Sequence, residues 1–180
     1  SAKDVILMSS LVFVCDESTK KIVRSLIDKA INGVNVYVLA DSFISKLLGH
    51  RQCMKMMKEN GINVHFAKDF YKYKGKAIYH SKKLVVDNKF AIIGGQNMIN
   101  ADNLSNGTDF KNRDIDLYVK GPIVSDIAEG FLTDWQHFYK TRKWYHRSPK
   151  VSVNDLLEKI IAQKEIEVTQ NLRGDELYED

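Results

Sequence analysis

The chain has 180 residues, enough for one domain whose apolar core folds without metals or disulfides. Hydrophobic residues make up 44% and charged residues 28%, which excludes the disordered and collagen-like classes of chain. The formal net charge of +4 favours anionic partners such as phosphate groups, acidic membrane surfaces or nucleic acid, and it serves solubility equally well. Composition therefore narrows the class of chain but names no function.

The two cysteines, Cys15 and Cys53, lie outside any C-x-x-C pair or Cys/His cluster with metal-ligand spacing. We therefore expect two buried free thiols in a reducing compartment, and neither a metal nor another cofactor.

The sequence contains no run of eighteen apolar residues and no signal-peptide cleavage site, which predicts a soluble domain. Because the chain starts without Met, we expect it to be part of a longer protein.

The first half of the chain alternates apolar strands with amphipathic helices. Helix-start residues at 16–19 precede apolar side chains at helical spacing, and Asn32-Gly33 ends that helix. Strands are expected at 4–14, 34–40 and 62–66, and a second helix at 45–60. The order β-α-β-α-β predicts parallel strands that helices cover.

The second half of the chain predicts a hairpin, a further strand and a long helix. Two strands, 77–87 and 89–94, are joined by a tight turn at Asp87-Asn88-Lys89. A polar loop at 100–111 leads to a strand at 115–119. The segment 123–139 carries apolar residues at helical spacing, as expected of a helix that packs on the sheet.

These elements predict an α/β fold with a mixed, largely parallel central sheet and helices on both faces. We expect residues 1–148 to form one lobe. A helix at 153–168 and an acidic, poorly patterned segment then form a C-terminal linker or tail within 149–180. The sequence shows no internal repeat.

Polar residues at fixed spacing surround the predicted hairpin. His80 and Lys82 lie two residues apart, so in a strand both side chains project from one face and Lys83 projects from the other. Asp87 follows at the tight turn. The second strand ends at Gly94-Gly95, and Asn97 follows this strand. We therefore expect Asn97 near the same end of the hairpin as His80.

This set of side chains indicates phosphoryl transfer. An imidazole can attack phosphorus, while an ammonium group and an amide donor stabilise charge on the nonbridging oxygens. That chemistry requires no metal. A nucleophilic imidazole also needs an acceptor that holds its second ring nitrogen, and Asp114 is our candidate, with Asp116 as the alternative.

The motif His80-x-Lys82-x4-Asp87, with Gly94-Gly95-x-Asn97, resembles the signature of the phospholipase D superfamily. The likeness covers roughly residues 4–140, and the flanking segments 33–41, 113–122 and 131–135 are similar to the first lobe of bacterial cardiolipin synthases.

The resemblance implies a role for each residue of the motif. His80 would be the phosphohistidine nucleophile, Lys82 and Asn97 would bind phosphate at the Gly94-Gly95 turn, and Asp114 would orient the imidazole. Asp87 is in that family largely a structural anchor. The resemblance also implies a parent protein that is cytoplasmic or membrane-associated in bacteria.

The family requires two motifs, because a second His protonates the leaving oxygen and later activates water or an alcohol. This chain has one motif, since His50, His65, His137 and His146 lack the companion Lys and Asp. Either a second lobe of the parent protein or a two-fold dimer would supply the missing motif. We favour the second lobe.

Three functions remain open at this point. The first is hydrolysis or phosphatidyl transfer on a phospholipid, with the basic and aromatic segments at 70–76 and 139–150 near the substrate or an anionic membrane surface. The second is a homodimeric phosphodiesterase that cleaves nucleic acid. The third is a noncatalytic lobe that only binds phosphate.

Overall fold

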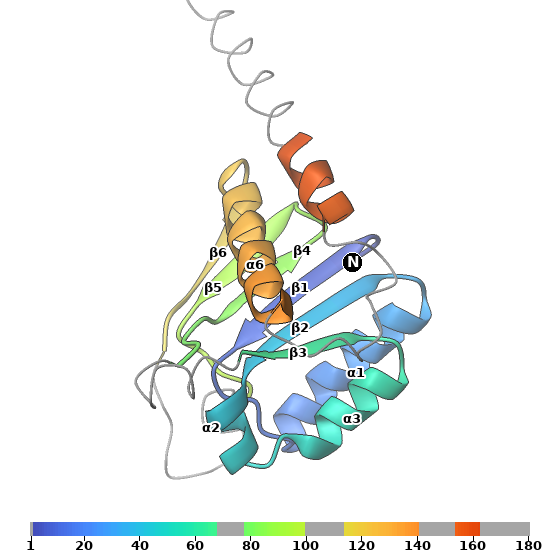
Figure 1. Cartoon of the computed structure of the whole chain (residues 1–180), viewed down its shortest axis with the longest axis vertical. Helices are drawn as coiled ribbons and strands as arrows, with labels where there is room; N and C mark the ends of the chain where they lie inside the picture. Colours follow the sequence, from blue (N-terminus) through green and yellow to red (C-terminus); the bar gives the residue numbers. More distant parts are fainter. Residues whose placement is uncertain (1, 68–77, 100–113, 141–153, 163–180) are drawn as a thin grey trace, which may run out of the picture.

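The structure, a computed structural model, describes residues 2–67, 78–99, 114–140 and 154–162 and is built on a six-stranded sheet. The strands are β1 (Val5–Ser10), β2 (Asn35–Asp41), β3 (Asn63–Ala67), β4 (Lys83–Val86), β5 (Phe90–Gly94) and β6 (Asp116–Lys120). Their order in the sheet is β3-β2-β1-β4-β5-β6 (Figure 1). β1, β2 and β3 are parallel, whereas β4, β5 and β6 each run antiparallel to the preceding neighbour in this order. The predicted mixed sheet is confirmed.

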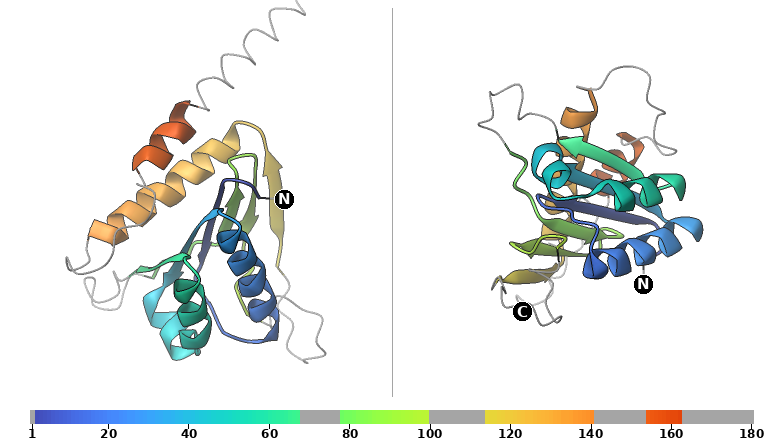
Figure 2. Two further views of the ribbon diagram at one scale, coloured as in Figure 1. Left: turned by 90° about the vertical axis from the view of Figure 1, so that its right-hand side faces the viewer. Right: turned by 90° about the horizontal axis from the view of Figure 1, so that it is seen from below.

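Helices cover both faces of the sheet, as the sequence predicted. The helices that pack on one face are α1 (Glu17–Ile31) and α3 (Arg51–Glu59), and α6 (Ile123–Lys140) packs on the other (Figures 1 and 2). The short helix α2 (Ser42–Leu47) follows β2 at the end of the sheet. Among the described residues, no helix is both long and apolar enough to cross a membrane.

Two apolar clusters, one on each face, hold these layers together. The cluster under α1 and α3 includes the buried side chains of Ile6, Met8, Val23, Leu26 and Met57. The cluster under α6 includes those of Leu7, Tyr37, Val85, Phe131 and Trp135. Both faces of β1 are therefore buried, which explains why its first four residues, Val5 to Met8, are all apolar instead of alternating with polar ones.

The predicted helix at 45–60 is wrong in one respect, because the structure has two helices there. Gly49 adopts a φ of 92°, a left-handed conformation that favours glycine and interrupts the helix between α2 and α3. Helix α2 also begins earlier than predicted. Its N-terminus is capped by Asp41, whose Oδ1 accepts hydrogen bonds from the backbone N–H groups of Phe43 and Ile44, both at 2.9 Å.

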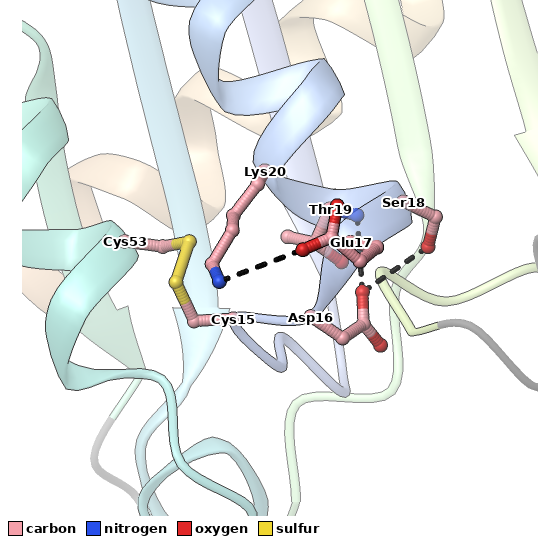
Figure 3. A network of polar contacts seen from close by, with 7 residues as sticks. All are labelled: Cys15, Asp16, Glu17, Ser18, Thr19, Lys20 and Cys53. Carbon is pink, nitrogen blue, oxygen red and sulfur yellow. Dashed lines mark hydrogen bonds and ion pairs between the residues drawn. A yellow bond between two sulfur atoms is a disulfide. The ribbon is translucent and has the colours of Figure 1, made fainter.

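The expectation of two free thiols is also wrong, because Cys15 and Cys53 form a disulfide (Figure 3). The fold brings the segment after β1 beside α3, so that the two Cα atoms lie 5.4 Å apart despite 38 residues of sequence separation. The reducing compartment, which we inferred from free thiols, therefore loses its basis. Next to the disulfide, Asp16 caps α1 by accepting a hydrogen bond from Thr19 N at 3.1 Å.

The C-terminal part of the described chain contains a helix at 154–162, inside the range predicted for the last helix. Its Ile160 is buried in the cluster under α6, and Asn154 accepts a hydrogen bond from the Gln136 side chain at 2.8 Å. This helix packs on the domain (Figure 2). The predicted loop at 100–111, the acidic segment after 168 and most of the two basic stretches lie outside the described residues.

Asp87 anchors the tight turn that joins β4 to β5. Asp87 and Asn88 have φ values of 52° and 53°, a left-handed conformation that Asp and Asn adopt more readily than most residues. The Asp87 carboxylate accepts hydrogen bonds from the backbone N–H groups of Lys3 and Asp4, both at 2.8 Å, and of Val5 at 3.0 Å. It therefore fixes the start of β1 against the end of β4.

These hydrogen bonds also set the ionisation of Asp87. Burial of the carboxyl group opposes the charged form, but the N–H groups of Val5, Asp4 and Lys3 more than offset this effect and hold the pKa of Asp87 below its ordinary value of 3.8. A lowered pKa in the folded state stabilises the protein above pH 4, and this stabilisation disappears as the pH falls through the folded-state pKa.

We predict that Asp87→Asn lowers the free energy of unfolding at pH 7 by about 1–3 kcal/mol, because one charged acceptor of buried N–H groups is lost. The difference from the wild type should shrink as the pH falls below about 4. Urea unfolding at a series of pH values measures it. Asp4→Asn removes an exposed carboxylate beside the same turn and serves as the control; a difference that stays constant with pH would contradict the role of Asp87.

Candidate active site

The predicted site residues, Asp87 excepted, lie at one end of the sheet, which we call the motif edge. β1 and β2 end there, β4 begins there because it is antiparallel to β1, and the pair Gly94–Asp116 closes it on β5 and β6. His80 and Lys82 precede β4 and therefore stand at this edge. Asp87 follows β4 and therefore lies at the opposite end of this strand from His80 and Lys82. It supports the fold from there and is not part of the motif edge.

His80 and Lys82 contact each other through their side chains. The Lys82 Nζ atom lies 3.0 Å from Nε2 and 3.2 Å from Nδ1 of the His80 ring. The imidazole is exposed, whereas Lys82 is half-buried. A cation held beside a solvent-accessible ring nitrogen leaves room for an anionic group that both side chains could contact at once.

Lys83 projects to the other side of the sheet. Its Nζ atom lies 3.6 Å from Oδ2 of Asp134 on α6. The structure therefore separates the two neighbouring lysines, with Lys82 beside His80 and Lys83 in an ion pair with a helix.

Three residues that the sequence did not single out hold the segment that carries His80. The backbone N–H of Tyr79 donates to Asp41 Oδ2, and the Tyr79 hydroxyl donates to Asp134 Oδ2, both at 2.9 Å. Asp41 is buried and caps α2 with its other oxygen. The sequence indicates the capping role of Asp41 only through its position, directly after an apolar strand and before a helix.

Tyr79 remains a hydrogen-bond donor under ordinary conditions. Burial of its ring and the nearby charge of Asp134 both raise the pKa of Tyr79 far above its usual value. Its ring packs edge-on against Phe138, with the centroids 5.4 Å apart. The residue next to His80 is therefore fixed on the α6 side by packing and by a hydroxyl that stays protonated.

Asn97 is held by the segment that follows β1. Its Oδ1 accepts a hydrogen bond from Val12 N at 3.1 Å, and its Nδ2 lies 3.5 Å from the Gly95 carbonyl oxygen. The next residue, Met98, exchanges backbone hydrogen bonds with Val12 and Val14 at 3.0 Å and 2.8 Å. These contacts fix the orientation of the Asn97 amide, with its carbonyl oxygen on the segment after β1 and its Nδ2 toward Gly95.

Gly94 and Gly95 allow β6 to approach the end of β5 closely. A methyl group on Gly94 would collide with the Asp116 side chain, and one on Gly95 would collide with the Asp114 carboxylate. Asp116 Oδ1 also accepts a hydrogen bond from Gln96 N at 3.4 Å. The two glycines are therefore required by packing, and they place both carboxylates at the motif edge.

Asp114 is exposed, and its Oδ1 accepts a hydrogen bond from Ile115 N at 3.0 Å. The ring nitrogens of His80 contact Lys82 in this structure. The predicted role of Asp114 as the acceptor that orients the imidazole therefore stays a prediction. Among the described residues, no three His, Cys, Asp or Glu side chains lie together as a metal site would require.

Comparison with known proteins assigns the family. The sequence profile of the family described as "Cardiolipin synthase, PLD-like domain" matches residues 1–135. The chain belongs to the phospholipase D superfamily. The sequence resemblance is thereby confirmed, and the matched residues of this phospholipase D-like domain include the whole motif from His80 to Asn97.

Curated relatives of the domain are cardiolipin synthases. A cardiolipin synthase of Clostridium perfringens (strain SM101 / Type A) is 33% identical over 141 residues, which are 76% of this chain and 29% of the relative. Cardiolipin synthase A of Pseudomonas putida (strain F1) is 29% identical over 147 residues, covering 79% of this chain and 30% of the relative. The phospholipase D-like domain thus spans less than a third of these relatives' length.

Solved structures confirm the fold. The phospholipase D family member Nuc from Salmonella typhimurium superposes with a TM-score of 0.61 at 23% identity, over 82% of this chain and 85% of that chain. NucT from Helicobacter pylori superposes with a TM-score of 0.57 at 15% identity, over 78% of this chain and 81% of that chain.

We predict that Asn97→Asp preserves the fold but weakens the binding of inorganic phosphate on the order of 100-fold, because a carboxylate retains the acceptor for Val12 N and replaces the amide donors by a charge that repels the anion. Isothermal titration calorimetry measures the affinity, and urea unfolding should show a change within about 1 kcal/mol. Gln96→Glu adds the same charge one residue away and serves as the control; an equal loss of affinity in both variants would contradict a specific role for Asn97.

Proposed function

We propose that this domain cleaves a phosphodiester through a covalent phosphohistidine at His80, as one lobe of an enzyme that transfers or hydrolyses phosphatidyl groups. The observation that carries the proposal is the contact between the His80 ring and the Lys82 ammonium at 3.0 Å, at an edge that also holds Asn97. The proposal thus takes His80 as the nucleophile and Lys82 and Asn97, at the same edge of the sheet, as the donors for phosphate oxygens. The cardiolipin synthase relatives support a phospholipid as the ester.

The first half of the reaction forms a phosphorus–nitrogen bond. A neutral ring nitrogen of His80 attacks phosphorus, and the bond between phosphorus and the leaving oxygen breaks as that oxygen receives a proton from a second His. Lys82 and the Asn97 amide donate hydrogen bonds to the nonbridging oxygens, where negative charge accumulates. In the second half, water or an alcohol loses its proton to the second His and attacks phosphorus, which releases His80.

The proposal assigns the orientation of the imidazole to Asp114, with Asp116 as the alternative acceptor. Both carboxylates stand at the motif edge beside the glycine turn. His80 is exposed, and the proposal requires its ring to turn from the Lys82 contact toward this side. A carboxylate that accepts the N–H of one ring nitrogen leaves the other nitrogen with its lone pair for attack on phosphorus.

The second His has no candidate among the other histidines that the structure describes. His50 and His65 are buried, and Nδ1 of His50 lies 2.6 Å from the Ser45 carbonyl oxygen. His137 lies exposed on α6, where its ring packs against Phe138, and it lacks the companion Lys and Asp of the motif. His146 lies outside the described residues. We propose that a second lobe of a longer protein supplies the partner motif, because the domain spans only 29% of its Clostridium perfringens relative.

We predict that the chain releases about one equivalent of p-nitrophenolate from bis(p-nitrophenyl) phosphate and retains an acid-labile phosphoryl group, because this leaving group departs without a proton donor. His80→Ala should abolish the burst, and Lys82→Ala should slow it by on the order of 10²–10³-fold. Stopped-flow absorbance measures the burst, and mass spectrometry locates the phosphoryl group.

His137→Ala, which removes an exposed His that lacks the companion Lys and Asp of the motif, should leave the burst unchanged. A full burst in His80→Ala, or a phosphoryl group on another residue, would disprove the assignment of the nucleophile. A chain that binds phosphate but gives no burst would instead support the noncatalytic lobe.

The source of the second motif can be tested separately. We predict that light scattering near physiological salt shows a monomer across protein concentrations, and that the burst is not followed by steady turnover. A stable dimer, with turnover that declines on dilution in step with the dimer fraction, would contradict a second lobe in the parent. It would support the homodimeric phosphodiesterase, which should then bind nucleic acid with a steep dependence on salt.

A further inference from the structure

The segment that carries His80 precedes the sheet, because β4 begins only at Lys83. The side chain of His80 is exposed, so the apolar core does not restrain the imidazole directly. The direction of the ring therefore depends on the main chain of residues 79–81 and on the groups that hold it. Tyr79, the residue before His80, is bonded to the domain at both of its ends.

Two carboxylates from different elements hold Tyr79. Oδ2 of Asp41 accepts the backbone N–H of Tyr79, and Oδ2 of Asp134 accepts its hydroxyl, both at 2.9 Å. Asp41 ends β2, whereas Asp134 lies on α6. A residue that is fixed both at its main chain and at the tip of its side chain cannot turn or slide, so the start of the next residue is set as well.

Each carboxylate is itself fixed by a second contact. The Asp41 side chain is buried, and its Oδ1 caps α2 by accepting the N–H groups of Phe43 and Ile44. Oδ2 of Asp134 also lies 3.6 Å from Nζ of Lys83, the first residue of β4. The two acceptors thus join Tyr79 to a helix cap on one side and to the beginning of the motif strand on the other.

We infer that Tyr79 is a positioning residue for His80, because its bonds to Asp41 and Asp134 hold the main chain from which the imidazole projects. The inference rests on the proposed role of His80 as the nucleophile and adds the residues that set its direction. Attack on phosphorus is sensitive to geometry, and a misplacement of about 1 Å costs on the order of 100-fold in rate. An exposed nucleophile gains this precision from its neighbours in the chain.

Two variants each break one of these bonds and keep the other. Tyr79→Phe loses the bond to Asp134 but retains the ring that packs on Phe138 and the N–H that Asp41 accepts. Asp41→Ser retains a side-chain cap for α2, but the shorter side chain does not reach Tyr79. Each variant should lower the rate constant of the p-nitrophenolate burst by on the order of 10-fold. The burst amplitude and the affinity for inorganic phosphate should stay unchanged.

Tyr37→Phe is the matched control, because it removes another hydroxyl from a side chain in the cluster under α6. It should leave the rate constant of the burst unchanged. Stopped-flow absorbance gives the rate constant and the amplitude separately, and urea unfolding gives the stability. If Tyr79→Phe and Asp41→Ser lower only the amplitude or the stability, Tyr79 has a merely structural role and the inference is wrong.

Nuclear magnetic resonance gives a readout that does not depend on the reaction. In the wild type, nuclear Overhauser effects between the His80 ring and the Lys82 side chain should report their 3.0 Å contact. Tyr79→Phe and Asp41→Ser should weaken these effects, because the ring loses its fixed direction, and Tyr37→Phe should not.

The two measurements separate this inference from the proposed function. A wild-type burst whose rate constant neither variant changes overturns the positioning role of Tyr79 and leaves His80 as the nucleophile. A wild type without a burst overturns the phosphohistidine, and the Overhauser effects then decide the positioning role alone. Effects of equal strength in the wild type and in both variants refute it.

Discussion

The Asp87 carboxylate and the three N–H groups that it binds determine how the rest of the motif is presented. These hydrogen bonds join the start of β1 to the end of β4 and fix the register in which Ser9 pairs with Lys83. A shift of one residue would turn every side chain of β4 to the opposite face of the sheet. Asp87 thus helps to set the register of the strand that follows His80 and Lys82, although it lies at the far end of that strand.

Much of the fold and the motif could be predicted from local patterns. The spacing of apolar residues revealed α1 and α6, and the signature from His80 to Asn97 pointed to the motif edge and to the family. Local patterns failed where the backbone departs from the expected geometry. The break at Gly49 between α2 and α3 depends on a left-handed backbone conformation. An isolated glycine in a helical pattern does not by itself predict such a break.

The features that the sequence could not supply are contacts between distant segments. The disulfide of Cys15 with Cys53 and the hydrogen bond of Tyr79 to Asp41 each join residues 38 apart, and Asn97 binds a backbone N–H 85 residues before it. The disulfide lies three residues after Val12, so it ties the segment that holds Asn97 to α3. Such contacts depend on the arrangement of the strands in the sheet, and the spacing of residues along the sequence does not predict them.

The side chains from 79 to 83 divide into those that bind α6 or β1 and those that contact each other. Tyr79 and Lys83 bind Asp134 on the α6 side, and Ser81 lies 3.2 Å from Ser9 through their hydroxyl oxygens. His80 and Lys82, the residues between them, contact each other through their side chains. Because successive side chains of an extended segment point to opposite sides, anchoring one set presents the other in a defined direction. Residues that bind the rest of the domain can therefore alternate, within five consecutive positions, with the two residues that we propose act on the phosphodiester.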